Sequence, residues 1–160
     1  MKRKPRDKKM NVTFRNFVKE DRETFFRMVK KFYAPPAVLH FPSDEVMLSA
    51  FDASIEMPQY VRGYLFECDG KPAGYAMVSL KFETEVGGLA AWIEELFVED
   101  EFRGKSIGTQ FFEFLKKEYS GKLKRIRLEA GEDNLDAIRL YKRLGFEFLD
   151  YRQMVIDKDF

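Results

Sequence analysis

A short glycine-containing loop, FRGKSIGT at residues 102–109, has the clearest capacity for chemistry in this sequence. Its GKS matches the last residues of the nucleotide-binding P-loop motif. A P-loop also needs a glycine five residues before the glycine of GKS, and Glu99 stands there instead. The loop lies between a strand-like run and a helical pattern, where the first N–H groups of a helix are unpaired and favour an anion. The sequence therefore predicts a phosphate-binding loop that is not a P-loop.

The residue types in this loop suit an anion. Two glycines let the backbone approach a phosphate without a Cβ in the way, two basic side chains add charge, and two hydroxyls add donors. These are, in that order, Gly104 and Gly108, Arg103 and Lys105, and Ser106 and Thr109. Basic, glycine-bearing loops also occur at ordinary turns, so the composition of the loop alone leaves that alternative open.

Periodicity along the chain predicts the elements around the loop, in the order β-α-α-β-β-β-α-β-α-β-β. Asp21, Ser43 and Asn134 are expected to cap helices, and Gly145 to end the last one. Turns are expected at residues 69–70 and 87–88. Strands are expected at 12–15, 61–68, 73–82, 89–98, 123–129, 146–149 and 153–156, and helices at 21–32, 44–56, 107–119 and 135–144.

The order of these elements predicts an α+β fold. The strand-helix-strand part over residues 89–129 should form a right-handed crossover with a parallel strand pair at the centre of the sheet. The rest of the mixed sheet should be antiparallel. The chain has 160 residues, of which 45% are hydrophobic, so residues 11–160 are expected to form a single domain.

Charge and cysteine content narrow the classes of function. With 28 basic and 27 acidic side chains, the chain has no general attraction for nucleic acid or an anionic membrane, and neither is expected as a partner. The basic residues 1–10 predict a disordered arm, with a nucleic-acid-binding arm as the alternative. One cysteine, Cys68, and one histidine, His40, make an intrachain disulfide impossible and a metal site unexpected. No secretion signal or membrane span is visible, so the cytoplasm is the expected compartment.

Two blocks of sequence resemble the GNAT (Gcn5-related N-acetyltransferase) superfamily. EELFVEDEFRGKSIG, from Glu94 to Gly108, resembles its central motif of Arg or Gln, two residues, Gly, one residue, then Gly or Ala. NLDAIRLYKRLGF, from Asn134 to Phe146, resembles a second landmark with Asn, Ala, Leu-Tyr and Gly-Phe. The element order over residues 12–156 is also similar to that of the family. The resemblance therefore implies a GNAT-like acetyltransferase domain.

The resemblance implies acetyl-CoA as co-substrate and no metal. Backbone N–H groups of the loop would hold the pyrophosphate, and the pantetheine arm would pair with the backbone of Phe97 and Val98. An N–H near Leu96 would polarise the thioester carbonyl. The loop residues concerned are Arg103, Gly104, Lys105, Ser106, Ile107 and Gly108, followed by Thr109. Ser106 replaces a family glycine and is expected to be tolerated if its φ angle is negative.

Direct attack of a neutral amine on the thioester needs an acid and a base. Tyr141 matches the family tyrosine that faces the sulfur and is the expected acid, while Asn134 would hold the pantetheine or cap its helix. Glu94 is the favoured base and Glu95 the second choice. Adjacent strand residues point to opposite faces, so Trp92 and Glu94 are expected to share the face of the open cleft.

The function implied is N-acetyltransfer from acetyl-CoA to a primary amine of a small molecule or peptide. Polyamines, aminoglycoside-like amines, amino acids and peptide N-termini all remain open as acceptors. A non-catalytic acyl-CoA-binding or sensor module of the same fold is the alternative. Residues 33–42 are expected to form a wall over the acceptor site, and the end strands could pair in a homodimer.

Overall fold

The computed structural model describes residues 10–34 and 41–156. Most of the basic arm and the stretch that contains His40 lie outside the described residues, so the expectations for them stay predictions. The chain divides into two compact units, one ending at Glu129 and the other beginning at Ala130. Each unit is described by itself, and the expectation of one domain over residues 11–160 also stays a prediction.

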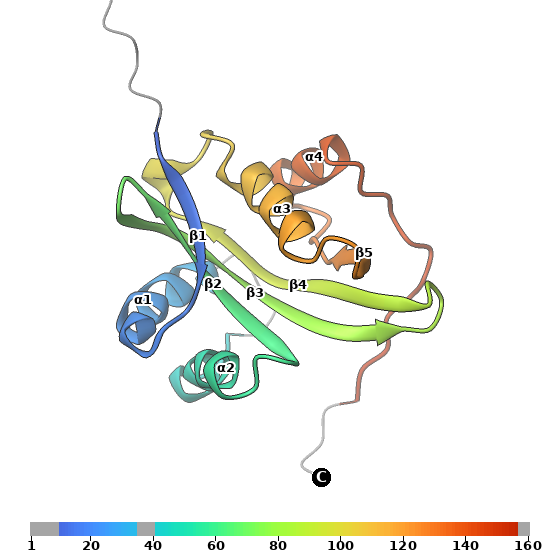
Figure 1. Ribbon diagram of the computed structural model, residues 1–160, viewed down its shortest axis with the longest axis horizontal. Coiled ribbons are helices and arrows are strands. Elements are labelled where there is room, and N and C mark those ends of the chain that lie inside the picture. Colours follow the sequence, from blue (N-terminus) through green and yellow to red (C-terminus); the bar gives the residue numbers. More distant parts are fainter. Residues whose placement is uncertain (1–9, 35–40, 157–160) are drawn as a thin grey trace, which may run out of the picture. The chain divides into compact units, whose positions relative to one another are not determined.

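The first unit is built on a five-stranded sheet with the order β1-β2-β3-β4-β5 (Figure 1). Neighbours from β1 to β4 are antiparallel, and β4 and β5 are parallel. The α+β class and the single parallel pair are therefore confirmed, although the pair lies at an edge of the described sheet rather than at its centre. The strands are β1 (Val12–Asn16), β2 (Val61–Cys68), β3 (Lys71–Glu83), β4 (Gly88–Val98) and β5 (Leu123–Leu128).

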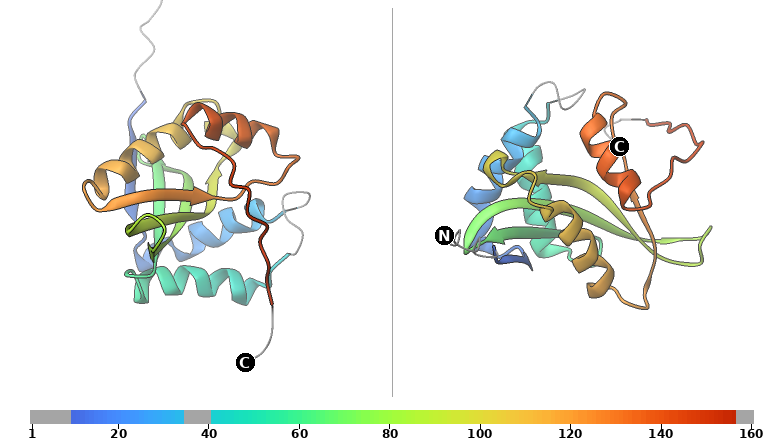
Figure 2. Two further views of the ribbon diagram at one scale, coloured as in Figure 1. Left: turned by 90° about the vertical axis from the view of Figure 1, so that its right-hand side faces the viewer. Right: turned by 90° about the horizontal axis from the view of Figure 1, so that it is seen from above.

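Helices cover both faces of this sheet (Figures 1 and 2). Two of them, α1 (Arg22–Phe32) and α2 (Asp44–Glu56), pack on one face, and α3 (Ile107–Glu118) packs on the other. Short 3-10 helices at Lys19–Asp21 and Asp100–Phe102 precede α1 and the loop before α3. The helices lie where the periodicity predicted them, because each presents one apolar stripe to the sheet.

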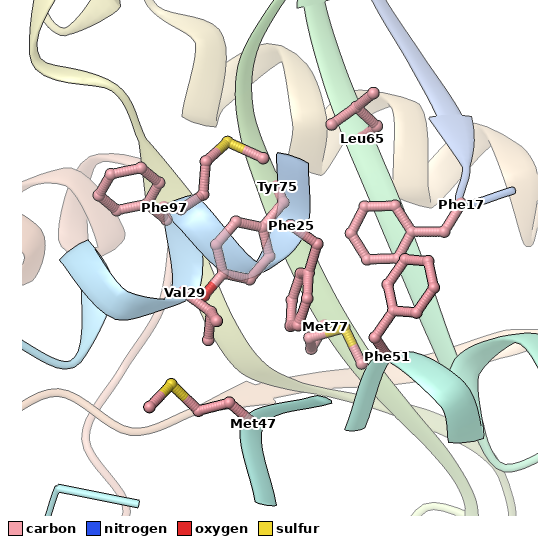
Figure 3. Close-up of a cluster of buried hydrophobic side chains, with 10 residues drawn as sticks. Phe17, Phe25, Val29, Met47, Phe51, Leu65, Tyr75, Met77 and Phe97 are labelled. Atoms are coloured by element: carbon pink, nitrogen blue, oxygen red, sulfur yellow. The ribbon is translucent and has the colours of Figure 1, made fainter. Parts of the chain in front are cut away.

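The core on the α1 and α2 face is aromatic (Figure 3). Gly63 on β2 is required there, because a Cβ at this position would lie 2.0 Å from the ring of Phe17. Burial of so many large rings is the main source of apolar stabilisation in the unit. The cluster consists of Phe17, Phe25, Met28, Val29, Met47, Phe51, Leu65, Tyr75, Met77 and Phe97.

The expected caps and turns are confirmed with one exception. The Ser43 hydroxyl accepts a hydrogen bond from the N–H of Val46 at 3.3 Å, and Asp69 and Gly70 both have positive φ, as a tight hairpin requires. Asp21 stands before α1 but its carboxylate does not cap that helix. It accepts two hydrogen bonds from Arg15, at 2.7 and 3.0 Å, and one from the backbone N–H of Val18 at 2.8 Å, so it closes the short 3-10 helix before α1 instead.

Cys68 is buried, as its apolar neighbours predicted, and burial raises the pKa of its thiol. Among the described residues, no helix has the length and apolar character needed to cross a membrane. The same part of the chain contains no cluster of three or more His, Cys, Asp and Glu side chains that could hold a metal ion.

The second unit contains one helix, α4 (Leu135–Arg143). Asn134 caps it through a hydrogen bond that its Oδ1 accepts from the N–H of Ala137 at 3.3 Å, and Gly145 follows it with a φ of 88°. The two strands predicted at 146–149 and 153–156 are wrong, because residues 144–156 form no strand. Alternation of apolar residues describes a strand's faces but supplies no hydrogen-bonding neighbour, and Met154 is 97% exposed here.

A buried ion cluster joins β5 to the end of β3. The Glu83 carboxylate is 8% exposed and contacts Lys81 at 3.5 Å and Arg125 and Arg127 at 3.0 Å each. The two arginines reach Glu83 across β4, on which Ala90 pairs with Arg125 and Trp92 with Arg127. Burial opposes ionisation, but the hydrogen bonds from the arginines outweigh it and hold the pKa of Glu83 below its ordinary value.

We expect this cluster to make stability depend on pH. Because the folded pKa of Glu83 is lowered, its contribution is complete above the unfolded pKa of about 4.3 and is lost as pH falls through the folded value. Glu83→Gln should lower the free energy of unfolding by about 1–3 kcal/mol at neutral pH. It should also flatten the acid limb, which is the fall of this free energy as pH decreases. Urea unfolding between about pH 3 and 7 measures this. Glu85→Gln, at a more exposed contact of Arg125, is the control, and an unchanged acid limb in Glu83→Gln contradicts the assignment.

Candidate active site

The loop before α3 presents a row of free backbone donors. Among the described residues, no oxygen accepts a hydrogen bond from the N–H groups of Gly104 to Thr109, and the first helical bond runs from the N–H of Gln110 to the carbonyl of Ser106. These donors lie at the positive end of the helix dipole. The arrangement is suited to an anion that needs several donors at once, such as a phosphate or pyrophosphate.

Left-handed backbone conformations shape this loop. Gly104 has a φ of 73° and Ser106 a φ of 59° with a ψ of 22°. A negative φ, the condition under which the serine was expected to be tolerated, is therefore not met at Ser106. The family glycine at this position is explained by the conformation, because a Cβ in the left-handed region costs about 1–2 kcal/mol. The Ser106 hydroxyl does not cap α3, so it is not used by the helix.

Arg103 braces the loop against the end of β4. Its Nε donates to the carbonyl of Val98 at 3.0 Å, and its Nη1 lies 3.0 Å from Asp100. Lys105 lies over the ring of Phe102, with Nζ 5.1 Å from the centroid. Both basic side chains therefore have contacts within the loop region, while the backbone N–H groups and the Ser106 hydroxyl are open donors.

The end of β4 next to this loop has a free edge. The parallel ladder between β4 and β5 ends where Ile93 pairs with Leu128. From Glu95 to Val98, β4 is paired with β3 alone among the described strands. An extended molecule could add to this edge as a further strand, since unpaired N–H and C=O groups are exposed along it. Leu96, Phe97 and Val98, the residues expected to contact the coenzyme, lie on this segment.

A β-bulge separates the two candidate bases. The register between β3 and β4 shifts at Glu94, which has no partner on β3. Trp92 pairs with Ser79, and Glu95 pairs with Met77. Met77 and Ser79 are two residues apart on β3, so their side chains face the same side of the sheet. Trp92 and Glu95 therefore share a face, which strict alternation along β4 does not predict, and the expectation for Glu94 stays a prediction. Glu94 itself is exposed.

Glu95 is buried and held by two tyrosines: Tyr33, from the segment 33–42 expected near the acceptor site, and Tyr75, which the sequence did not single out. Tyr33, just after α1, donates to Oε1 at 2.6 Å, and Tyr75 on β3 donates to Oε2 at 2.8 Å. Burial raises the pKa of Glu95, the two phenol hydrogen bonds oppose that rise, and the charge of Glu94 adds to it. No local pattern predicts these contacts, because they join three elements far apart in sequence.

In the second unit, Tyr141 lies on α4 with its ring 5.7 Å from that of Phe146. Burial raises the pKa of its phenol, so the hydroxyl is protonated at neutral pH, as an acid must be. Asn134 serves as the helix cap, which confirms one of its two expected roles. Its contact with a coenzyme stays a prediction, as does the part of Tyr141 in proton transfer.

Comparison of the sequence with known proteins gives the same family as the one that the two motifs resemble. The model of the family described as "Acetyltransferase (GNAT) family" matches residues 17–146. The spermine/spermidine N(1)-acetyltransferase of Bacillus subtilis (strain 168) is 32% identical over 84 residues. That match covers 50% of this chain and 55% of the relative, so only about half of either protein is compared.

Solved structures show the same fold at low identity. A possible acetyltransferase from Clostridium difficile 630 has a TM-score of 0.80 at 16% identity and covers 93% of this chain and 99% of its own. The aminoglycoside N-acetyltransferase AAC(6')-Iy in complex with CoA has a TM-score of 0.76 at 16% identity. The match covers 96% of this chain and 99% of the aminoglycoside enzyme's chain. At these identities the likeness concerns the fold.

The conformation of Ser106 leads to a stability prediction. Ser106→Gly should raise the free energy of unfolding by about 1 kcal/mol, because glycine adopts a positive φ without steric cost. Ser120→Gly is the matched control, since Ser120 is an exposed serine without a positive φ, and it should lower stability. Urea unfolding of both variants measures the difference. A destabilised Ser106→Gly would show that the loop does not hold this conformation.

Proposed function

Because the chain belongs to the acetyltransferase (GNAT) family, we propose that it transfers an acetyl group from acetyl-CoA to a primary amine of a small cationic molecule. The observation that carries this proposal is the row of free backbone N–H groups from Gly104 to Thr109 at the start of α3. It is the donor set that a pyrophosphate needs, and the family to which the chain belongs uses a coenzyme that carries one.

In this proposal the coenzyme lies along the end of β4. The pyrophosphate accepts hydrogen bonds from the loop, and the pantetheine arm adds to the free edge at Phe97 and Val98. The thioester carbonyl then accepts from a backbone N–H near Leu96, which stabilises the negative charge that develops on its oxygen. The bracing of the loop by Arg103 supports this geometry, since it fixes the loop against the same strand end.

The reaction is a direct transfer. The amine nitrogen attacks the thioester carbon, the C–S bond breaks, and coenzyme A leaves as a thiol after taking a proton from the Tyr141 hydroxyl. Glu94 removes the proton that the amine loses. Exposure favours Glu94 over Glu95 in this role, because the proton must reach solvent and both oxygens of Glu95 are engaged by tyrosine hydroxyls.

The acceptor we favour is an alkyl polyamine. Two adjacent carboxylates, Glu94 and Glu95, lie on the strand beside the proposed thioester position and favour a cationic molecule. The Bacillus subtilis relative bears the name of a spermine/spermidine acetyltransferase, which supports the same class. Aminoglycosides, amino acids and peptide N-termini are the other acceptors to test.

A non-catalytic acyl-CoA sensor of the same fold is the alternative, and the serine in place of the family glycine is the observation in its favour. Release of free thiol from acetyl-CoA in the presence of spermidine distinguishes the two functions. A transferase releases thiol only when both molecules are present. Binding of acetyl-CoA without thiol release for any amine of the classes above would contradict the transferase.

Removal of the proposed base gives a sharper test. Glu94→Gln should lower kcat/KM for the amine by about 10²- to 10⁴-fold, because the proton loses its acceptor. Affinity for acetyl-CoA should not change. Glu113→Gln, at an exposed glutamate on α3, is the control and should behave as wild type. Retained activity in Glu94→Gln would exclude Glu94 as the base.

Removal of the proposed acid tests the other half of the reaction. Tyr141→Phe should lower kcat by about 10²- to 10⁴-fold while calorimetric binding of acetyl-CoA persists. The control in the same unit is Tyr151→Phe, since Tyr151 is 69% exposed. An equal loss of kcat in both variants would indicate a structural effect. No loss of kcat in Tyr141→Phe would exclude Tyr141 as the acid.

A further inference from the structure

Glu95 differs from the other buried carboxylates of the described residues in what neutralises it. Asp21 contacts Arg15 at 2.7 Å, and Glu83 is paired with two arginines and a lysine. The exposed fractions of all three residues are 7–8%. Within the described part of the chain, the Glu95 side chain forms hydrogen bonds only with two phenols, and no lysine or arginine lies within 4.0 Å of it.

An unneutralised carboxylate inside a protein is costly. Burial of a charged group without a charged partner is strongly unfavourable, and neutral hydrogen bonds remove only part of that cost. Apolar side chains would fill this position at lower cost, since Tyr75 lies in the apolar cluster of Figure 3, edge-to-face with Phe25 at 5.0 Å. The negative charge of the Glu95 carboxylate is therefore best explained by a ligand that brings a positive charge close to it.

The position of Glu95 identifies that ligand as the acceptor. It is the neighbour of the exposed Glu94 on the bulge, and its Oε1 is bonded to the half-buried Tyr33 on the side of α1. Tyr33 is the last residue before the segment that leads to α2. The charge therefore lies beneath the face on which the proposed amine binds, rather than beside the phosphate-binding loop.

We propose that Glu95 determines acceptor specificity by selecting amines that carry a second positive charge, and that Tyr33 and Tyr75 are positioning residues that hold its carboxylate. This inference rests on the proposed acetyl transfer. Glu95 acts through its electric field rather than by contact, because little of it is exposed. Over roughly 8 Å at an effective dielectric constant of about 20, opposite unit charges change an affinity on the order of 10-fold or more.

The role of Tyr33 gives this selection a pH dependence. The titratable groups that act on Glu95 from the elements around it are Tyr33 after α1, Tyr75 on β3 and Glu94 on β4. Burial raises the pKa of Glu95, and the hydrogen bond from Tyr33 opposes that rise. Selection requires the charged carboxylate, so it is present above this pKa and is lost as pH falls. Tyr33→Phe raises the pKa further, so selection is lost at a higher pH.

The test compares 1,4-diaminobutane with butylamine, which match in length and differ in one ammonium group. The ratio of their kcat/KM values is measured against pH for wild type, Glu95→Gln and Tyr33→Phe. Glu95→Gln should lower the ratio about 10-fold, with butylamine changed less than about twofold. Tyr33→Phe should keep the wild-type ratio at high pH and lose it at a higher pH than wild type does. Tyr64→Phe, which loses a buried hydroxyl bonded to Tyr119, is the control and should not change the ratio.

Calorimetric titration of the coenzyme-loaded protein with the same two amines keeps the inference separate from the proposed function. Preferential binding of the diamine that disappears in Glu95→Gln upholds the inference even if no acetyl transfer occurs, and absent transfer then contradicts the proposed function alone. Three results overturn the inference. They are no preference for the diamine in wild type, an unchanged ratio of kcat/KM values in Glu95→Gln, and equal losses of kcat/KM for both amines in that variant. If Glu95→Gln does not fold, the shift of the pH profile in Tyr33→Phe decides.

Discussion

The ladder between β4 and β5 ends before β4 does, and the candidate site depends on that mismatch. Pairing stops at Ile93 and Leu128, while β4 continues to Val98. The continuation gives the sheet a free edge, and the loop that follows leads into α3 with its N–H groups unpaired. A single interruption of strand pairing therefore creates a place for an extended molecule and, at its end, a place for an anion.

The charges of this sheet are arranged in two different ways along β4. Near its start, the Glu83 cluster neutralises a buried carboxylate and ties β5 to β3, which holds the parallel pair together where it exists. Near its end, the bulge at Glu94 turns one carboxylate to solvent, and Glu95 remains buried without a cation in the described part of the chain. The first arrangement stabilises the fold, and the second is suited to a cationic ligand.

Much of this could be predicted from sequence, because the signals are local. Apolar residues at helical spacing placed α3 at Ile107, and the glycine-bearing loop before it was found from residue types alone. The bulge at Glu94 could not be predicted, since it depends on how β3 and β4 align, and it places Trp92 and Glu95 on one face, which strict alternation does not predict. Apolar alternation likewise predicted strands after residue 145 that lack a pairing partner in the structure.

The left-handed conformation of Ser106 changes what its departure from the family glycine means. Strain in the backbone is present both before and after a ligand binds, as long as the loop keeps its shape, so it cancels in the affinity and remains in the stability of the fold. The hydroxyl does not cap α3 and can donate to an oxyanion, an interaction worth about 1.5–3 kcal/mol with a charged partner. The serine is therefore expected to lower the stability of the loop, and its effect on coenzyme affinity stays a prediction. A sequence comparison alone registers the lost glycine but not the φ of 59° at which the serine stands.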